Sequence, residues 1–106
     1  HNIDGVRELV KFLEQSFANK KITYIFGVMK DKQYKEMIDL IKVNAKTVYA
    51  VNVNNIRALD SIELCSELNE HGVSSISFET VQNAITYCYN NTVKDDVICI
   101  FGSLYI

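Results

Sequence analysis

The sequence predicts a three-layer α/β domain, with a mainly parallel sheet and helices on both faces of it. Four short apolar runs recur at intervals of about 25 residues, which leaves room for a helix between each pair of strands. The segments between these runs carry apolar residues at the three- and four-residue spacing of a helix. Strands that alternate with helices in this way are typical of a parallel sheet, because each crossover helix packs back onto it.

The first half of the chain contains two predicted helices and two predicted strands. Asn2 and Asp4 are suited to cap the first helix. Residues 22–28 form a nearly continuous apolar run, as expected for a strand that is buried on both faces. Helical spacing resumes over residues 34–41, and the β-branched run 47–53 is the second predicted strand.

The second half repeats the alternation twice. A capping-box pattern begins at Asp60, and Gly72 ends the helix that follows it. Residues 73–78 are the third predicted strand, Thr80 is suited to cap the last helix, and residues 97–101 form the most apolar strand. The residues that we expect to face inward from the last helix are Val81, Ala84, Ile85 and Cys88.

Composition limits the classes of partner. At 106 residues the chain is the size of one domain, and its 13 acidic and 11 basic residues give a net charge of −2. This balance provides no general attraction to nucleic acid or to an anionic membrane, and no apolar run approaches the ~20 residues of a membrane span. The chain begins at His1 and opens on a helix, so we expect a fragment that lacks the strand before it.

The three cysteines, Cys65, Cys88 and Cys99, are odd in number and include no C-x-x-C pair. Such usage suits the reducing cytoplasm better than a disulfide framework, and we expect all three to be small buried hydrophobic residues. His1 and His71 do not lie at ligand spacing from them, so we predict no metal site.

Polar side chains follow the apolar runs at the points where the predicted strands end. The segments 1–5, 27–32 and 102–105 together carry a cation, a carboxylate, an imidazole and a hydroxyl. Ligands of open α/β sheets bind beyond the carboxyl ends of the strands. These segments therefore predict a binding site.

Four segments in the same order carry a resemblance to a known family. They are His1-Asn2-x-Asp4-Gly5, Phe26-Gly27-Val28-Met29-Lys30-Asp31-Lys32, Asn55-x-Arg57-Ala58-Leu59 and Gly102-Ser103-Leu104-Tyr105. Together they resemble the C-terminal domain of folylpolyglutamate synthase and dihydrofolate synthase, in the Mur ligase superfamily. The resemblance covers essentially the whole chain and implies a Rossmann-like domain.

The resemblance also implies an ATP-dependent amide ligase. Such an enzyme activates a carboxyl group of a folate or pteroate as an acyl phosphate, which L-glutamate then attacks. In the family a larger N-terminal domain of the same enzyme holds most of the ATP and Mg²⁺, and the C-terminal domain helps to place nucleotide and glutamate. The phosphate-binding pattern G-x-x-x-x-G-K-[ST] is absent from this sequence, so we expect the isolated domain to be inactive. The resemblance does not choose between the two activities.

Five of the implied binding residues lie in the first two segments. His1 matches a family histidine near the nucleotide phosphates and the incoming glutamate, and Asn2 follows it in register. Lys32 matches a basic position that contacts a carboxylate or phosphate. Lys30 is the alternative for that role, and Asp31 is suited to orient either lysine.

The last two segments contain two further candidate binding residues. Ser103 matches a family serine near the glutamate pocket, where its hydroxyl can donate to a carboxylate. Arg57 is a weaker candidate, which could clamp an anion with two hydrogen bonds. No catalytic residue is expected within this domain alone. Ile3 and Ile56 replace family prolines, which implies looser loops because proline restricts the backbone.

Two other functions remain open on the sequence alone. One is a non-catalytic, regulatory α/β module that binds a small ligand. The other is a small α/β carrier with Cys99 or Cys65 as nucleophile, which requires an exposed thiol of low pKa.

Overall fold

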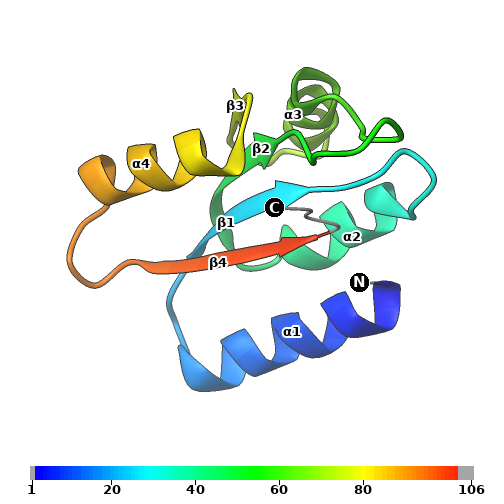
Figure 1. The fold of residues 1–106 in the computed structure, drawn as a ribbon. Helices are drawn as coiled ribbons and strands as arrows, with labels where there is room; N and C mark the ends of the chain where they lie inside the picture. The colour runs from blue at the N-terminus through cyan, green and yellow to red at the C-terminus, as the bar shows by residue number, and fades with distance from the viewer. Residues whose placement is uncertain (1, 103–106) are drawn as a thin grey trace.

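The computed structural model describes residues 2–102, and these alternate between helix and strand as predicted (Figure 1). Every predicted element is present within this range, with ends that differ from the predictions by a few residues. In chain order they are α1 (Ile3–Ser16), β1 (Ile22–Gly27), α2 (Tyr34–Ile41), β2 (Ala45–Val51), α3 (Ser61–Glu70), β3 (Ser75–Phe78), α4 (Val81–Asn91) and β4 (Val97–Gly102).

The four strands form one parallel sheet in the order β3-β2-β1-β4. β1 pairs with β4 along its full length, from Ile22 opposite Val97 to Gly27 opposite Gly102. Because all the strands run the same way, their carboxyl ends meet at one edge of the sheet. The residues that follow β1 and the end of β4 at Gly102 therefore lie at a common edge.

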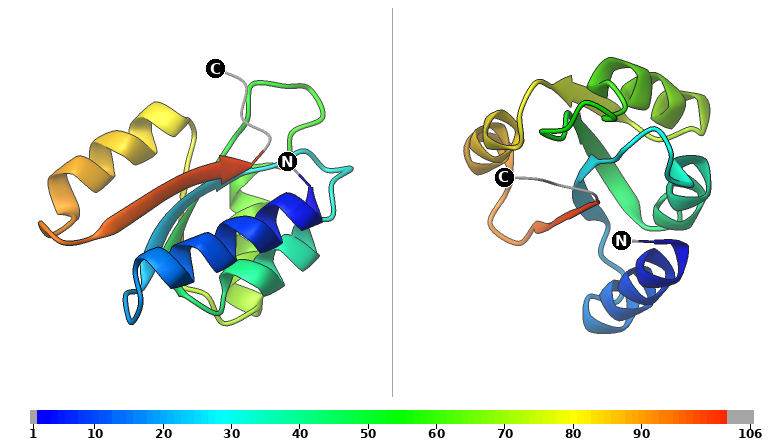
Figure 2. Two further views of the ribbon diagram at one scale, coloured as in Figure 1. Left: turned by 90° about the horizontal axis from the view of Figure 1, so that it is seen from below. Right: turned by 45° about the vertical axis from the view of Figure 1, so that its right-hand side comes forward.

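Helices cover both faces of the sheet, which confirms the predicted three-layer architecture (Figure 2). The larger core cluster joins α1, α2 and α3 to one face, whereas a smaller cluster joins α4 to the other face. The buried helix residues of the larger cluster are Val6, Val10, Leu13, Met37, Ile38, Ile41, Leu64 and Leu68. Those of the smaller cluster are Ala84 and Cys88.

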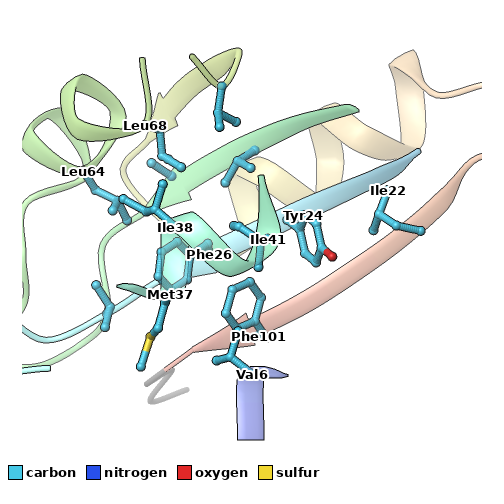
Figure 3. Packing of buried hydrophobic residues seen from close by; sticks show 14 of the residues in the cluster. Val6, Ile22, Tyr24, Phe26, Met37, Ile38, Ile41, Leu64, Leu68 and Phe101 are labelled. Atoms are coloured by element: carbon cyan, nitrogen blue, oxygen red, sulfur yellow. The ribbon is translucent and has the colours of Figure 1, made fainter. Parts of the chain in front are cut away.

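Aromatic side chains of β1 and β4 occupy the centre of the larger cluster (Figure 3). The rings of Phe26 and Phe101 stack with their centroids 4.6 Å apart, and Tyr24 meets Phe101 edge to face at 5.6 Å. The phenol of Tyr24 is fully buried and donates to Oδ1 of Asn44 at 2.7 Å. This packing ties the two strands together beneath their carboxyl ends.

The predicted helix caps are present. Oδ1 of Asn2 accepts from the Gly5 N–H at 2.9 Å, and Oδ1 of Asp60 accepts from the Ile62 N–H at 2.8 Å. Oγ1 of Thr80 accepts from the Asn83 N–H at 3.0 Å. After α3, Gly72 has a φ of +81°, the left-handed conformation expected of a residue that ends a helix.

Two burial predictions are wrong. Of the three cysteines only Cys88 is buried, while Cys65 and Cys99 are half-buried at the margin of the larger cluster. Ile85 was expected to face inward but is exposed, because α4 alone lies over this face and does not cover all four strands. Within residues 2–102, no helix has the length and apolar character needed to cross a membrane.

Candidate functional site

The direction of the chain reverses between β1 and β4. From β1 the chain moves to β2 and then β3, with α2 and α3 on one face; α4, on the opposite face, then carries it back to β4. Where the order of the strands reverses in this way, α/β proteins bind ligands beyond the carboxyl ends of the strands. This point in the topology favours the ends of β1 and β4 as the site.

Gly102 allows the ends of β1 and β4 to approach closely. Gly102 has a φ of +116°, and a Cβ on this residue would collide with the carbonyl oxygen of Gly27. Only glycine fits this position without strain. The backbones of the two strand ends therefore lie in close contact at this position.

The segments that follow β1 and β2 are joined by backbone hydrogen bonds. The Lys30 N–H donates to the Arg57 carbonyl at 2.8 Å, and the Leu59 N–H donates to the Val28 carbonyl at 2.9 Å. Between them, Met29 and Ala58 form an antiparallel bridge. Two segments that lie far apart in the sequence therefore form one unit, which we call the loop pair (residues 28–32 and 55–59).

An ion pair also connects the two halves of the loop pair. Nη1 of Arg57 lies 2.7 Å from Oδ2 of Asp31. The same arginine is held through its backbone, because its N–H donates to Oδ1 of Asn55 at 2.8 Å. Asp31 was expected to orient Lys30 or Lys32, and the structure instead pairs it with the arginine.

Lys30 and Lys32 project from the loop pair as exposed cations. Neither lysine forms a side-chain ion pair with another residue in the part of the chain that the structure describes. Lys32 lines a shallow hollow of about 210 Å³ at the start of α2. Three cations and a single carboxylate give the loop pair a net positive charge, which suits an anionic ligand.

Asn2 begins α1 at the same edge of the sheet, because α1 runs opposite to the strands (Figure 2). Its side-chain oxygen is occupied by the helix cap, so the amide nitrogen is the group left to contact a ligand. His1 and Ser103, together with Tyr105, lie outside the described residues. Their roles stay predictions from the resemblance.

A second hollow, of about 330 Å³, was not anticipated from the sequence. It lies between the end of β2 and the start of α4, with Asn52, Asn54 and residues 79–82 in its lining. The only signal for it was the asparagine that directly follows the apolar run. The lining contains Glu79 and no lysine or arginine, so this hollow suits an anion less well than the loop pair.

The cysteines do not form a reactive centre. Cys99 packs half-buried against the larger core cluster, and burial raises the pKa of its thiol, which disfavours the nucleophilic thiolate. The Cys65 sulfur lies 3.7 Å from the side-chain nitrogen of Asn69. Residues 2–102 hold no group of three or more histidine, cysteine or acidic side chains arranged to bind a metal ion.

Comparison with known proteins identifies a family for this chain. The family model described as "Mur ligase, glutamate ligase domain" matches residues 1–104. The chain belongs to this family. The loop pair and the ends of β1 and β4 thus lie inside a Mur ligase domain.

Two curated relatives of this Mur ligase domain act on folates by name. The dihydrofolate synthase/folylpolyglutamate synthase of Bacillus subtilis (strain 168) is 29% identical over 107 residues, which cover 99% of this chain and 24% of the relative. The folylpolyglutamate synthase of Lacticaseibacillus casei is 37% identical over 107 residues, which cover 100% of this chain and 23% of the relative. The chain spans about a quarter of the length of either relative.

A solved structure shares the fold of this Mur ligase domain. It is a bifunctional folylpolyglutamate synthase/dihydrofolate synthase with Mn, AMPPNP and L-glutamate bound. The TM-score is 0.78 at 22% identity, and the match covers 98% of this chain and 24% of the solved chain. The solved structure therefore has the same α/β architecture over this part of its chain.

Proposed function

We propose that this chain is the C-terminal domain of an ATP-dependent folylpolyglutamate synthase or dihydrofolate synthase, in which it helps to place nucleotide and L-glutamate. The observation that carries the proposal is the loop pair. It holds two exposed lysines beyond the strand ends at the point where the topology reverses. The folate-linked names of the curated relatives support the choice of substrates.

The proposed reaction has two steps. A carboxylate oxygen of the folate or pteroate attacks the γ-phosphorus of ATP, and ADP leaves. The glutamate amine then attacks the acyl carbon, a proton is lost from nitrogen, and inorganic phosphate leaves. Both steps gather anionic oxygens at the junction of the reactants, which is where fixed cations stabilise charge.

Lys30 and Lys32 are proposed to bind these anions, as the phosphate oxygens of the nucleotide or the carboxylates of glutamate. Both ammonium groups are exposed in this structure, where water weakens their attraction to an anion. An N-terminal domain that covers the loop pair would exclude that water and strengthen the attraction. Arg57 is proposed to position the loop pair through Asp31, since its guanidinium already holds that carboxylate.

His1, Asn2 and Ser103 are proposed as the remaining contacts to nucleotide and glutamate. An imidazole can donate to a phosphate or carboxylate oxygen, and its charge can change near neutral pH. The amide nitrogen of Asn2 and the hydroxyl of Ser103 can each donate a hydrogen bond to a carboxylate.

The N-terminal domain of the same enzyme is the proposed site of most ATP and Mg²⁺ contacts. Residues 2–102 lack a cluster of ligands for a metal ion, and the full sequence lacks a G-x-x-x-x-G-K-[ST] phosphate loop. Mg²⁺ would supply charge neutralisation on the phosphates when bound. We propose the cytoplasm as the compartment, in keeping with three free cysteines.

The test uses the complete gene product that contains this chain. ADP release would be followed with ATP, Mg²⁺ and L-glutamate, and with either dihydropteroate or a reduced folate as acceptor. We expect acceptor- and glutamate-dependent ADP formation that falls at least about tenfold in Lys32→Ala, the loss of one charge-assisted contact. Lys94→Ala removes an exposed lysine from the turn before β4, at the opposite edge of the sheet, and should leave the rate unchanged.

The outcomes separate the remaining possibilities. Turnover with one acceptor alone would identify which of the two activities the enzyme has. A folded full-length protein that is silent with both acceptors would overturn the ligase proposal and favour the non-catalytic binding module. Equal losses of activity in Lys32→Ala and Lys94→Ala would contradict the proposed contact between Lys32 and an anionic reactant.

A further inference from the structure

The hollow of about 330 Å³ lies where β2 and β3 end. These strands end together, with Val51 opposite Phe78, so Asn52 and Glu79 leave neighbouring strands side by side. The chain then turns into α4, which covers the face of the sheet opposite to α2 and α3 (Figure 1). The hollow has two walls, residues 52–54 after β2 and residues 79–82 at the start of α4. Neither wall contains a residue of the loop pair.

The first wall provides hydrogen-bond donors. Oδ1 of Asn52 accepts from the Ser61 N–H at 2.8 Å. Only the oxygen of a side-chain amide can accept such a bond, so the orientation of this amide is fixed and its Nδ2 remains as a donor. Asn54 adds an exposed amide to the same wall, and Gln82 adds one to the other wall.

Glu79 gives the second wall the opposite hydrogen-bonding character. Within residues 2–102 no basic side chain forms an ion pair with its carboxylate, and the lining of the hollow contains no lysine or arginine. A carboxylate repels phosphates and other carboxylates, whereas it accepts strong hydrogen bonds from N–H groups. The hollow therefore favours an uncharged ligand with an N–H group for Glu79 and an acceptor for the amides.

Each wall also contributes one valine. Val53 is 6% exposed, and Val81 is half-buried. Small-molecule sites combine apolar surface of this kind with a few polar groups, and a flat ring places its faces on the first and its edge on the second. The volume is near the lower end of the roughly 300–1,000 Å³ of such sites, which suits one ring system better than a complete nucleotide.

We propose that this hollow binds a flat, uncharged nitrogen heterocycle that carries an N–H donor beside a carbonyl or ring-nitrogen acceptor. The ring would lie between Val53 and Val81, with its N–H group toward Glu79 and its acceptor toward the amides. Purine and pterin rings both have such an edge. A sugar of similar size has hydroxyl groups around its ring and would gain less from the valines.

A bound ring would connect the two walls. In the described part of the chain, no hydrogen bond joins residues 52–54 to residues 79–82. A ligand that contacts both walls should therefore restrain them, and the amides at the start of α4 should exchange with solvent more slowly.

The first test measures amide hydrogen exchange in the complete gene product with 9-methyladenine or 6-methylpterin at saturation. We expect exchange over residues 79–83 to slow at least about threefold, with residues 97–102 unchanged. Protection by only one of the probes would identify purine or pterin as the ring type. Because the readout is local, binding of a probe elsewhere in the complete protein does not produce it.

A matched ligand tests the contact with Glu79. In 6,9-dimethylpurine a methyl group replaces the amino group of 9-methyladenine at similar size, which removes the N–H donor. We expect it to bind at least about tenfold more weakly, as measured by the concentration that half-protects residues 79–83.

Matched variants complete the test. Glu79→Gln should weaken binding of 9-methyladenine about tenfold and leave 6,9-dimethylpurine unchanged, since the second ligand has no N–H group for the carboxylate. Glu70→Gln makes the same change at an exposed position at the end of α3, outside the hollow, and should affect neither ligand.

Three results would overturn the proposal. The first is unchanged exchange over residues 79–83 with both probes, a result that requires no variant to fold. The second is equal binding of 9-methyladenine and 6,9-dimethylpurine, or a folded Glu79→Gln variant with parental binding. The third is protection by ribose in place of the rings, which would show a site for polyols. Each readout is a binding measurement, so the proposal stands or falls independently of ligase activity.

Discussion

Oδ2 of Asp31 and Nη1 of Arg57 lie 2.7 Å apart and join two loops that follow different strands. Backbone hydrogen bonds run alongside this ion pair, so the loops do not depend on it alone. Both side chains are more than half exposed. We therefore expect the ion pair to influence the conformation of the loop pair and to contribute little to the stability of the fold.

This arrangement predicts that Arg57→Ala costs little stability. An exposed ion pair contributes about 0–1 kcal/mol, and we expect the free energy of unfolding to fall by no more than that. In the complete enzyme, the KM for L-glutamate should rise while kcat changes little, because the loop pair loses a support and not a reacting group. A double-mutant cycle with Asp31→Asn checks this, since independent effects of the two changes would contradict a shared positioning role.

Gly102→Ala should destabilise the domain strongly. Its φ of +116° and the collision of a new Cβ with the Gly27 carbonyl both oppose any side chain. We expect a loss of roughly 3 kcal/mol or more in urea unfolding. Gly72→Ala is the matched control, because it has a φ of +81° but no atom near the new Cβ, and should cost about 1 kcal/mol. Equal losses at the two positions would contradict the close approach.

Asn2→Ala should lower stability by about 1 kcal/mol through loss of the helix cap. Asn2→Asp keeps an oxygen that can accept from the Gly5 N–H and should unfold like the parent chain. If Asn2 also contacts an anion, as proposed, Asn2→Asp should still raise the KM for glutamate in the complete enzyme. Thermal unfolding and steady-state kinetics on the two variants separate the cap from the contact.

The buried Tyr24 predicts a loss of stability in alkali. Burial raises the pKa of this phenol above its ordinary value near 10, so above that pH the unfolded chain releases a proton that the folded chain retains. The folded state then binds more protons, and stability falls as the pH rises. Tyr24→Phe should flatten this fall between about pH 10 and 12, although Tyr49, whose pKa is also raised by burial, will leave part of it.

The same variant should be less stable at neutral pH. Tyr24→Phe removes the hydroxyl that donates to Asn44, whose Nδ2 already has no partner in the described part of the chain. An unsatisfied buried group costs about 1–3 kcal/mol. Urea titrations of both proteins at pH 7 and pH 10.5 measure the two effects, and parallel pH profiles would contradict the assignment to Tyr24.

Thiol labelling of the folded chain should be slow at Cys88 and Cys99. Burial raises the pKa of both thiols, which lowers the thiolate fraction at pH 8. We expect both to react more slowly than the same residues in urea, when labelled with iodoacetamide and located by mass spectrometry. Labelling of folded Cys99 as fast as in urea would revive the carrier hypothesis.

Hydrophobic spacing was enough to predict the alternation of helices and strands. Residues 22–28 form a nearly continuous apolar run, which is typical of a strand that is covered on both faces. The caps at Asn2, Asp60 and Thr80 were also predictable, because a cap depends on neighbours two or three residues away. These features are local, so a linear pattern contains them.

Other features depend on contacts between distant segments. Nothing in the linear pattern of 28–32 and 55–59 says that Asp31 meets Arg57 and not a neighbouring lysine; that follows from the pairing of β1 with β2, which brings their loops together. Likewise, Ile85 has the spacing of an inward residue, yet it is exposed because α4 alone lies over that face. Helical spacing records which residues share a face, whereas strand order and the width of the sheet determine what that face meets.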